Sequence, residues 1–168
     1  MNKRPILKVE LNFIDKIIEA IGWILLISIW VFVIYNYLDL PDTIPVHYNA
    51  AGEADKFGDK LNILALPIIA SLLFVGLSYL NKKSHFFNFP TTITKENAVH
   101  QYSVATRMIR FLKLAILIIF GLVMFKTIQN TKGTETDLGI WFLPFTLVLI
   151  FVPIFYFLIQ SSKSNFVK

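Results

Sequence analysis

One short stretch of this 168-residue chain, residues 40–60, gathers side chains that could do chemistry. It reads LPDTIPVHYNAAGEADKFGDK and combines one imidazole with several carboxylates. Such a set suits zinc or another divalent ion, and it also suits general acid–base catalysis. The candidate ligands are His47, Glu53 and Asp55, but no HExxH-like spacing accompanies the histidine. We therefore expect no cofactor and no metal, and keep zinc as the alternative.

The first half of this stretch is predicted to be a short strand. Pro41 and Pro45 fix their own φ angles and push the residues before them toward extended backbone. Apolar and polar residues alternate from Thr43 onward, which is typical of a half-buried strand. The apolar face is expected to hold Ile44, Val46 and Tyr48, and the opposite face Thr43, Pro45, His47 and Asn49.

The second half is predicted to return as a hairpin. Asn49 to Gly52 reads as a turn because Asn and Gly adopt positive φ at low cost, and residues 53–57 form a second strand that Gly58 ends. This hairpin is expected to cover the ends of helices. Its polar groups either bind an external peptide or a lipid headgroup, or cap helix ends and bond within the loop. The binding residues expected here are His47, Tyr48, Asn49, Gly52, Glu53, Asp55 and Lys60.

The rest of the sequence is that of an integral membrane protein. Hydrophobic residues make up 55% of the chain and charged residues 16%, whereas soluble domains usually have about 25% charged residues. Mean hydropathy is +0.62. A membrane-spanning helix needs roughly 20 apolar residues. The segments that qualify are residues 17–38, 61–80, 111–128 and 140–160. We predict an all-α membrane protein, a four-helix bundle in a single domain over residues 1–168.

The distribution of basic residues predicts how the bundle sits in the membrane. Twelve of the sixteen lysines and arginines lie before the first helix, between the second and third, or after the fourth. Lysine and arginine concentrate on the cytoplasmic side. We therefore expect both termini to be cytoplasmic and the hairpin to be extracytoplasmic, in a bacterial inner membrane.

Two lysines interrupt the third apolar segment. Lys113 and Lys126 leave only residues 114–125 free of charge, too few to span the hydrocarbon. Long lysine side chains can extend to opposite interfaces, and we expect this here. The alternative is a charge that faces the interior of the bundle. Glu19, near the start of the first helix, has the same two interpretations.

Residues 88–113 are predicted to begin with a turn at residues 88–90 and to continue from Thr94 as an amphipathic connector helix that runs into the third span. Thr94 is the expected N-cap, with Glu96 in the first turn. His100, Ser103, Arg107 and Arg110 follow one another at helical spacing. A basic stripe beside a membrane suits anionic lipid headgroups. The residues of this stripe expected to meet lipid or a cytoplasmic partner are Arg107 and Arg110.

The loop motif resembles the signature of a bacterial membrane domain of uncharacterised function. The matching positions are Leu40-Pro41-Asp42-x-Ile44-Pro45-x-His47-Tyr48-Asn49-x-x-Gly52-Glu53-x-Asp55-x-x-Gly58-x-Lys60. That domain is known best as the N-terminal part of the SdpI-type immunity proteins, which protect cells from a secreted sporulation-delaying peptide toxin. The resemblance implies a non-catalytic protein in peptide-toxin immunity or envelope stress sensing, with the outer loop as recognition surface. Relatives with this signature commonly carry a stretch similar to residues 93–107, which implies a packing or partner role for Asn97, Gln101 and Tyr102 of the cytoplasmic connector.

Several other classes of protein are excluded because the sequence lacks the residues or motifs that they need. No cysteine is present, which excludes disulfides and thiolate ligands. No Walker, Rossmann or nucleophile-elbow motif appears, and the basic residues follow the membrane segments, so nucleic acid is not an expected partner. The expected partners are membrane lipids, an external peptide and a cytoplasmic regulator. The alternative function is a metal-dependent membrane enzyme that acts on peptide or lipid at the outer face.

Overall fold

A computed structural model describes residues 4–133 and 137–163. The chain is mainly helical, and four of its helices are long and apolar enough to cross a membrane, the second together with a short 3-10 helix over Lys60–Leu64. The helices are α1 (Phe13–Tyr37), α2 (Ala65–Asn81), α3 (Ala98–Thr131) and α4 (Phe142–Lys163). The predicted four-helix membrane architecture is confirmed.

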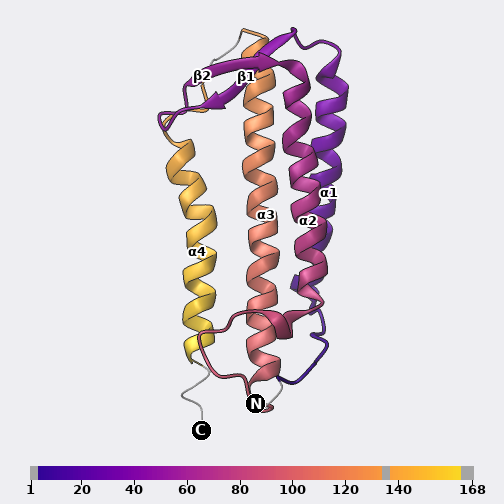
Figure 1. Ribbon diagram of the computed structural model, residues 1–168, viewed down its shortest axis with the longest axis vertical. Coiled ribbons are helices and arrows are strands. Elements are labelled where there is room, and N and C mark those ends of the chain that lie inside the picture. Colours follow the sequence, from indigo (N-terminus) through magenta and orange to yellow (C-terminus); the bar gives the residue numbers. More distant parts are fainter. Residues whose placement is uncertain (1–3, 134–136, 164–168) are drawn as a thin grey trace.

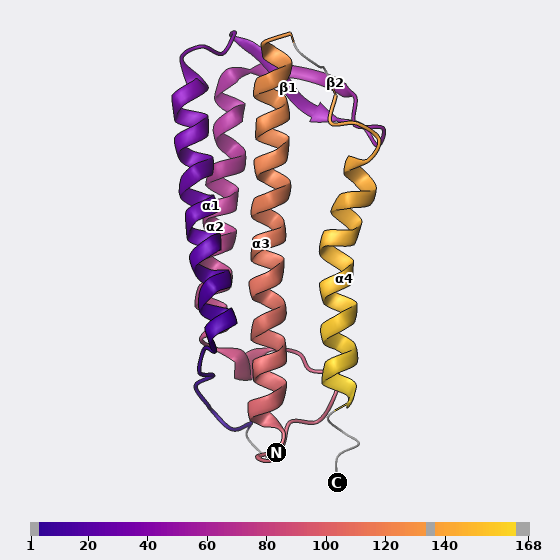
Figure 2. The same cartoon turned by 180° about the vertical axis from the view of Figure 1, so that it is seen from behind.

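The central helix is α3, which packs against each of the other three (Figure 1). α1 and α2 lie side by side, whereas α4 stands apart from them and packs against α3 (Figure 2). Buried aliphatic residues of α1 and α3, such as Val33 and Leu117, form the core with Phe74 of α2. The Phe74 ring lies so close to Gly22 that a Cβ there would sit 2.6 Å from it. This contact lets α1 and α2 approach closely.

The starts of α1 and α3 differ from the prediction for local reasons. α1 starts at Phe13, four residues early, because Asn12 and Asp15 form a reciprocal capping box in which each side chain accepts a hydrogen bond from the other's backbone. α3 starts at Ala98, because Thr94 and Asn97 bond to each other in a turn and do not open the helix. The connector and the third span form one continuous 34-residue helix, about 50 Å long.

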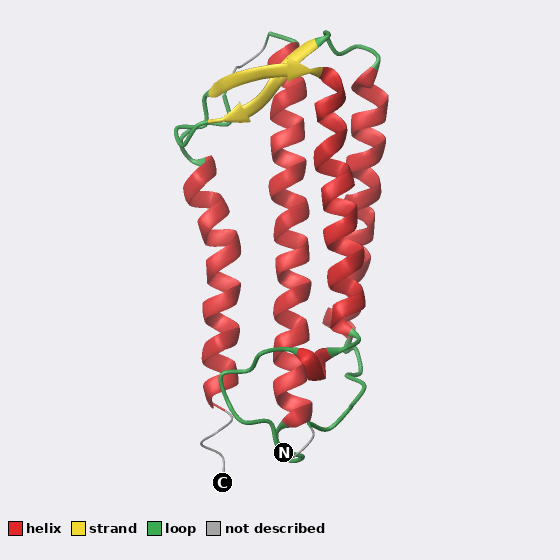
Figure 3. Cartoon of the chain, viewed as in Figure 1, coloured by secondary structure: helices red, strands yellow, loops and turns green. Residues whose placement is uncertain are grey.

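A two-stranded antiparallel sheet lies across the helix ends opposite the N-terminus (Figure 3). Its strands are β1 (Thr43–Tyr48) and β2 (Ala54–Asp59), so the predicted hairpin is confirmed. Two details of the prediction are wrong. Gly58 pairs with Ile44 inside the sheet and does not end β2. The register shifts between Pro45 and His47, so alternation breaks: Pro45 is buried beside Ile44, and Val46 is exposed.

Candidate functional site

The polar residues of the hairpin turn mostly hold the turn together. The side-chain oxygen of Asn49 accepts hydrogen bonds from the backbone N–H groups of Ala51 and Glu53, at 2.9 and 3.0 Å. Its amide donates to the Glu53 carboxylate at 2.9 Å. An asparagine that bonds to backbone a few residues ahead mimics a backbone turn. Asn49 and Glu53 therefore bond within the loop, which agrees with the alternative in which the polar groups of the hairpin hold the loop together.

Gly52 joins the hairpin to the segment before α4. Its φ is +84°, as the turn prediction required, and its carbonyl accepts a hydrogen bond from the Leu138 N–H at 2.7 Å. A Cβ at Gly52 would lie 2.7 Å from backbone atoms of Gly139. The Asp137 carboxylate accepts from the Ala54 N–H at 3.3 Å. The segment before α4 thus docks onto the hairpin through backbone that only glycine permits.

Tyr48 anchors the hairpin to α3. Its hydroxyl lies 2.9 Å from the Thr127 Oγ1 and accepts from the Asn130 amide at 3.2 Å. Burial raises the pKa of Tyr48 above its ordinary value of 10.0, although these hydrogen bonds oppose the shift. The phenol is therefore a neutral structural tie between β1 and the last turns of α3.

His47 and Asp55 face each other across the sheet. The His47 Nδ1 lies 2.5 Å from the Asp55 Oδ1, and both side chains remain partly exposed. At the other end of the hairpin, Lys60 pairs with Asp42 at 3.0 Å. Across residues 4–133 and 137–163, no three histidines or carboxylates gather as metal ligands. His47 and Asp55 form a pair, and Glu53, the third metal candidate, turns to Asn49.

An apolar cavity of about 380 Å³ lies beneath β1. Its walls come from β1, from the segment that enters α2, from the last turns of α3 and from the start of α4. The principal lining residues are Ile44, Ile63, Leu66, Val123, Leu138 and Phe142. Polar side chains lie among them, including His47 and Asn62. The hairpin therefore covers a hydrophobic compartment at the ends of three helices.

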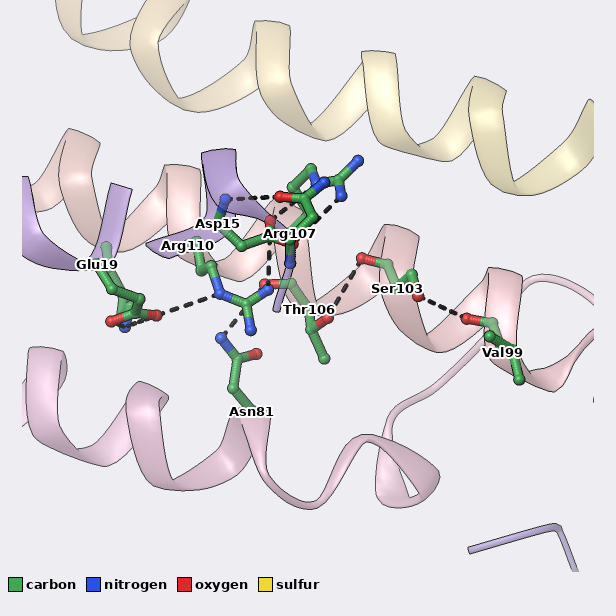
Figure 4. Close-up of polar contacts among 10 residues, drawn as sticks. Asp15, Glu19, Asn81, Val99, Ser103, Thr106, Arg107 and Arg110 are labelled. Carbon is green, nitrogen blue, oxygen red and sulfur yellow. Dashed lines mark hydrogen bonds and ion pairs between the residues drawn. The ribbon is translucent and has the colours of Figure 1, made fainter. Parts of the chain in front are cut away.

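A second cluster of charged side chains lies between α1 and α3, near the start of α1 (Figure 4). Asp15 and Glu19 of α1 face three cations of α3, namely Arg107, Arg110 and Lys113. We call these five residues the ionic cluster. Arg107 holds Asp15 through two hydrogen bonds, from Nε at 2.9 Å and from Nη2 at 3.3 Å. This fork geometry fixes the start of α1 against α3.

Lys113 is buried between the helices and turns toward α1. Its side chain is 2% exposed, and its Nζ donates to both Glu19 oxygens at 2.8 Å and to the Ser78 hydroxyl at 2.6 Å. The ammonium also lies 4.4 Å from the centre of the Phe74 ring. The expectation that Lys113 and Glu19 reach outward is wrong, because each of these side chains has its charged partner on a neighbouring helix.

The other predicted connector residues also make internal contacts. Gln101 is fully buried and exchanges hydrogen bonds with Ser161 of α4. Tyr102, also fully buried, donates to the Pro5 carbonyl at 3.0 Å. Asn97 accepts from the Thr94 N–H and donates to the Thr92 carbonyl. The basic residues predicted to face lipid differ in exposure, because α3 is the central helix. Arg110 is buried, and Arg107 is partly exposed.

Some members of this site were missed in the sequence. Asp15, Ser78 and Asn81 were not singled out, yet Asp15 and Ser78 contact cations of α3, and Asn81 donates to the Thr106 carbonyl at 3.3 Å. A signal was present. Asp15 and Glu19 are four residues apart and so share one helix face, and the three cations of α3 recur every third residue. Complementary charged faces on two apolar helices predict that the helices pair.

The fold and both polar sites define a multi-pass membrane protein with four candidate spans and a structured cap. Residues 24–70, from within α1 to the first turns of α2, match a family model described as a domain of unknown function, DUF1648. The chain is also similar to an uncharacterized protein of Archaeoglobus fulgidus, with 30% identity over 83 residues. That match covers 45% of each protein, so the chain spans less than half the length of this relative. No solved structure matches.

Proposed function

We propose that this is a non-catalytic protein of the bacterial cytoplasmic membrane, similar to the SdpI-type immunity proteins, that acts in peptide-toxin immunity or envelope stress sensing. Its hairpin face is the recognition surface. The observation that carries this proposal is the apolar cavity beneath β1. The resemblance of residues 40–60 to the immunity-protein signature supports it.

The cavity suits an apolar ligand group. A volume of about 380 Å³ is within the usual range of small-molecule pockets, which are mostly apolar with a few polar groups. Asn49, Gly52 and Glu53 are occupied in holding the hairpin. Recognition therefore falls to the cavity and to His47, which lines it. A hydrophobic side chain of an external peptide would fill the cavity.

The proposal places the hairpin outside the cell. Of the fourteen basic residues that the structure describes, ten lie toward the end of the bundle away from the hairpin, which favours cytoplasmic termini. The chain has no cysteine, so single cysteines report topology cleanly. In whole cells, an impermeant thiol reagent should label Ala50→Cys and should not label Pro90→Cys. The reverse pattern would invert the topology and refute an external recognition surface.

Protection of cells tests the function directly. We expect a sensitive bacterium that expresses this chain to survive higher doses of the secreted sporulation-delaying peptide toxin than cells with an empty vector. Val123→Trp fills the cavity from α3 and should abolish this protection. The matched control is Val75→Trp, which places the same side chain on an exposed position of α2.

Protein levels in the membrane are measured for each variant, so that loss of protection is compared at equal expression. Protection by wild type and by Val75→Trp, with none by Val123→Trp, supports recognition in the cavity. Equal protection by both variants would refute the role of the cavity. No protection by the wild-type chain would refute immunity to this peptide.

A further inference from the structure

The ionic cluster contains an unequal number of opposite charges. Three cations, Arg107, Arg110 and Lys113, face two carboxylates, Asp15 and Glu19. Three of these five side chains are at least nine-tenths buried, since Asp15, Arg110 and Lys113 are exposed by 4, 6 and 2%. A buried charge without a counter-charge is costly in a low-dielectric environment. The cluster as described has one positive charge in excess.

The carboxylate oxygens cannot satisfy all the donors. Both Glu19 oxygens accept from Lys113, and both Asp15 oxygens accept from Arg107. The Nε of Arg110 lies 3.3 Å from Glu19 and its Nη1 3.8 Å from Asp15, but neither atom forms a hydrogen bond within the described part of the chain. The cluster has more donors than acceptors, and an additional anion would correct both imbalances.

One side of the cluster is open to the outside of the bundle. Arg107 is 34% exposed and lies on the side of the cluster toward α4, whereas Arg110 lies toward Asn81 of α2 (Figure 4). After Glu19, α1 continues without a charge to its end at Tyr37, a length of about 27 Å that approaches the thickness of the hydrocarbon core. The cluster therefore lies at one headgroup level of the bilayer.

We propose that the ionic cluster is a binding site for the headgroup phosphate of a net-anionic phospholipid. Arg107 contacts the phosphate through the part of its guanidinium that Asp15 does not occupy. Arg110 lies behind it as a buried positive charge whose field is not cancelled. A lipid that carries one net negative charge neutralises the excess, whereas a zwitterionic lipid does not. This site is independent of the hairpin cavity and of the function proposed for it.

Lipid binding to the purified full-length protein in neutral detergent tests the proposal. Native mass spectrometry would count bound phosphatidylglycerol and, separately, phosphatidylcholine over a titration of each. We expect phosphatidylglycerol to bind about fivefold more tightly, which corresponds to about 1 kcal/mol for one charge near a membrane surface. Inorganic phosphate at matched ionic strength serves as the probe for a free anion.

Two substitutions in one ion pair distinguish lipid binding from a purely structural role. Arg107→Gln removes the excess charge and should weaken phosphatidylglycerol binding about fivefold. Asp15→Asn doubles the excess and should strengthen it. Both changes break the same pair, so a structural role predicts that they act in the same direction. Lys83→Gln, at an exposed position, controls for total charge.

The outcomes separate clearly once circular dichroism shows that each variant is folded. Opposite changes for Arg107→Gln and Asp15→Asn, with Lys83→Gln like wild type, support the site. Changes of the same sign would refute it, as would equal binding of the two lipids. Displacement of phosphatidylglycerol by inorganic phosphate would show a site for free anions and would refute the lipid assignment. If Arg107→Gln fails to fold, Asp15→Asn alone decides: weakened or unchanged phosphatidylglycerol binding overturns the proposal.

Discussion

Replacement of Lys113 by methionine tests whether the interior of this bundle contains a true ion pair. Methionine keeps the length and the apolar character of the side chain but removes the ammonium, which donates to Glu19 twice at 2.8 Å and to Ser78. Glu19 would then be left facing the bundle with only Arg110 nearby, at 3.3 Å. We therefore expect Lys113→Met to destabilise the protein.

The size of the effect follows from burial. Removal of one partner of a buried pair costs about 3–5 kcal/mol. The lower end, about 3 kcal/mol, applies here because Glu19 is 22% exposed and Arg110 still compensates part of its negative charge. Glu19→Gln should cost a similar amount. The double variant should cost far less than the sum of the two, with a coupling free energy of about 2 kcal/mol.

The assay is reversible unfolding in mixed micelles, with helicity followed by circular dichroism as the fraction of denaturing detergent rises. Lys83→Met, at an exposed lysine outside the helices, is the matched control and should change the free energy of unfolding by less than about 0.5 kcal/mol. The reasoning fails if Lys113→Met is equally mild and the coupling is near zero. Lys113 would then point to the interface, as its sequence position first suggested.

Three further predictions concern the hairpin end. Gly52→Ala should destabilise the protein by more than about 1 kcal/mol, because the position has a positive φ and a Cβ would meet Gly139; Gly76→Ala, in open space within α2, should be neutral or stabilising in the same unfolding assay. Because burial raises the pKa of Tyr48 in the folded state, the stability that its neutral phenol contributes is present below the unfolded-state value of about 10 and is lost as pH rises through the folded-state value. Ultraviolet absorbance should show one fewer late-forming phenolate in Tyr48→Phe than in wild type, and equal titration curves would contradict the buried anchor. Elemental analysis of the purified protein should find less than one zinc per chain. Stoichiometric zinc that is lost in His47→Ala would instead support the alternative membrane enzyme.

The sequence alone determined the elements whose causes are local. The four helices follow from apolar segments in a chain with few charges, because backbone in lipid must satisfy its own hydrogen bonds. The hairpin follows from Pro41, Pro45 and the Asn49–Gly52 turn, because these residues restrict or extend the available φ angles. Their placement needed no knowledge of distant contacts. The starts of the helices were predicted less well. A capping box at Asn12 and a local turn at Thr94 fix where α1 and α3 begin, and helix propensity along the sequence does not show this.

Only the tertiary structure decided which polar groups meet. Asp15 and Arg107 are 92 residues apart in the chain, and Glu19 and Lys113 are 94 apart. Helical spacing alone could not show whether a lysine in an apolar segment reaches outward or finds a partner, because both conformations satisfy the same sequence. The central position of α3 settled this, since each of its faces meets another helix. The cavity beneath β1 likewise depends on how three helix ends and the hairpin pack, which no single segment specifies.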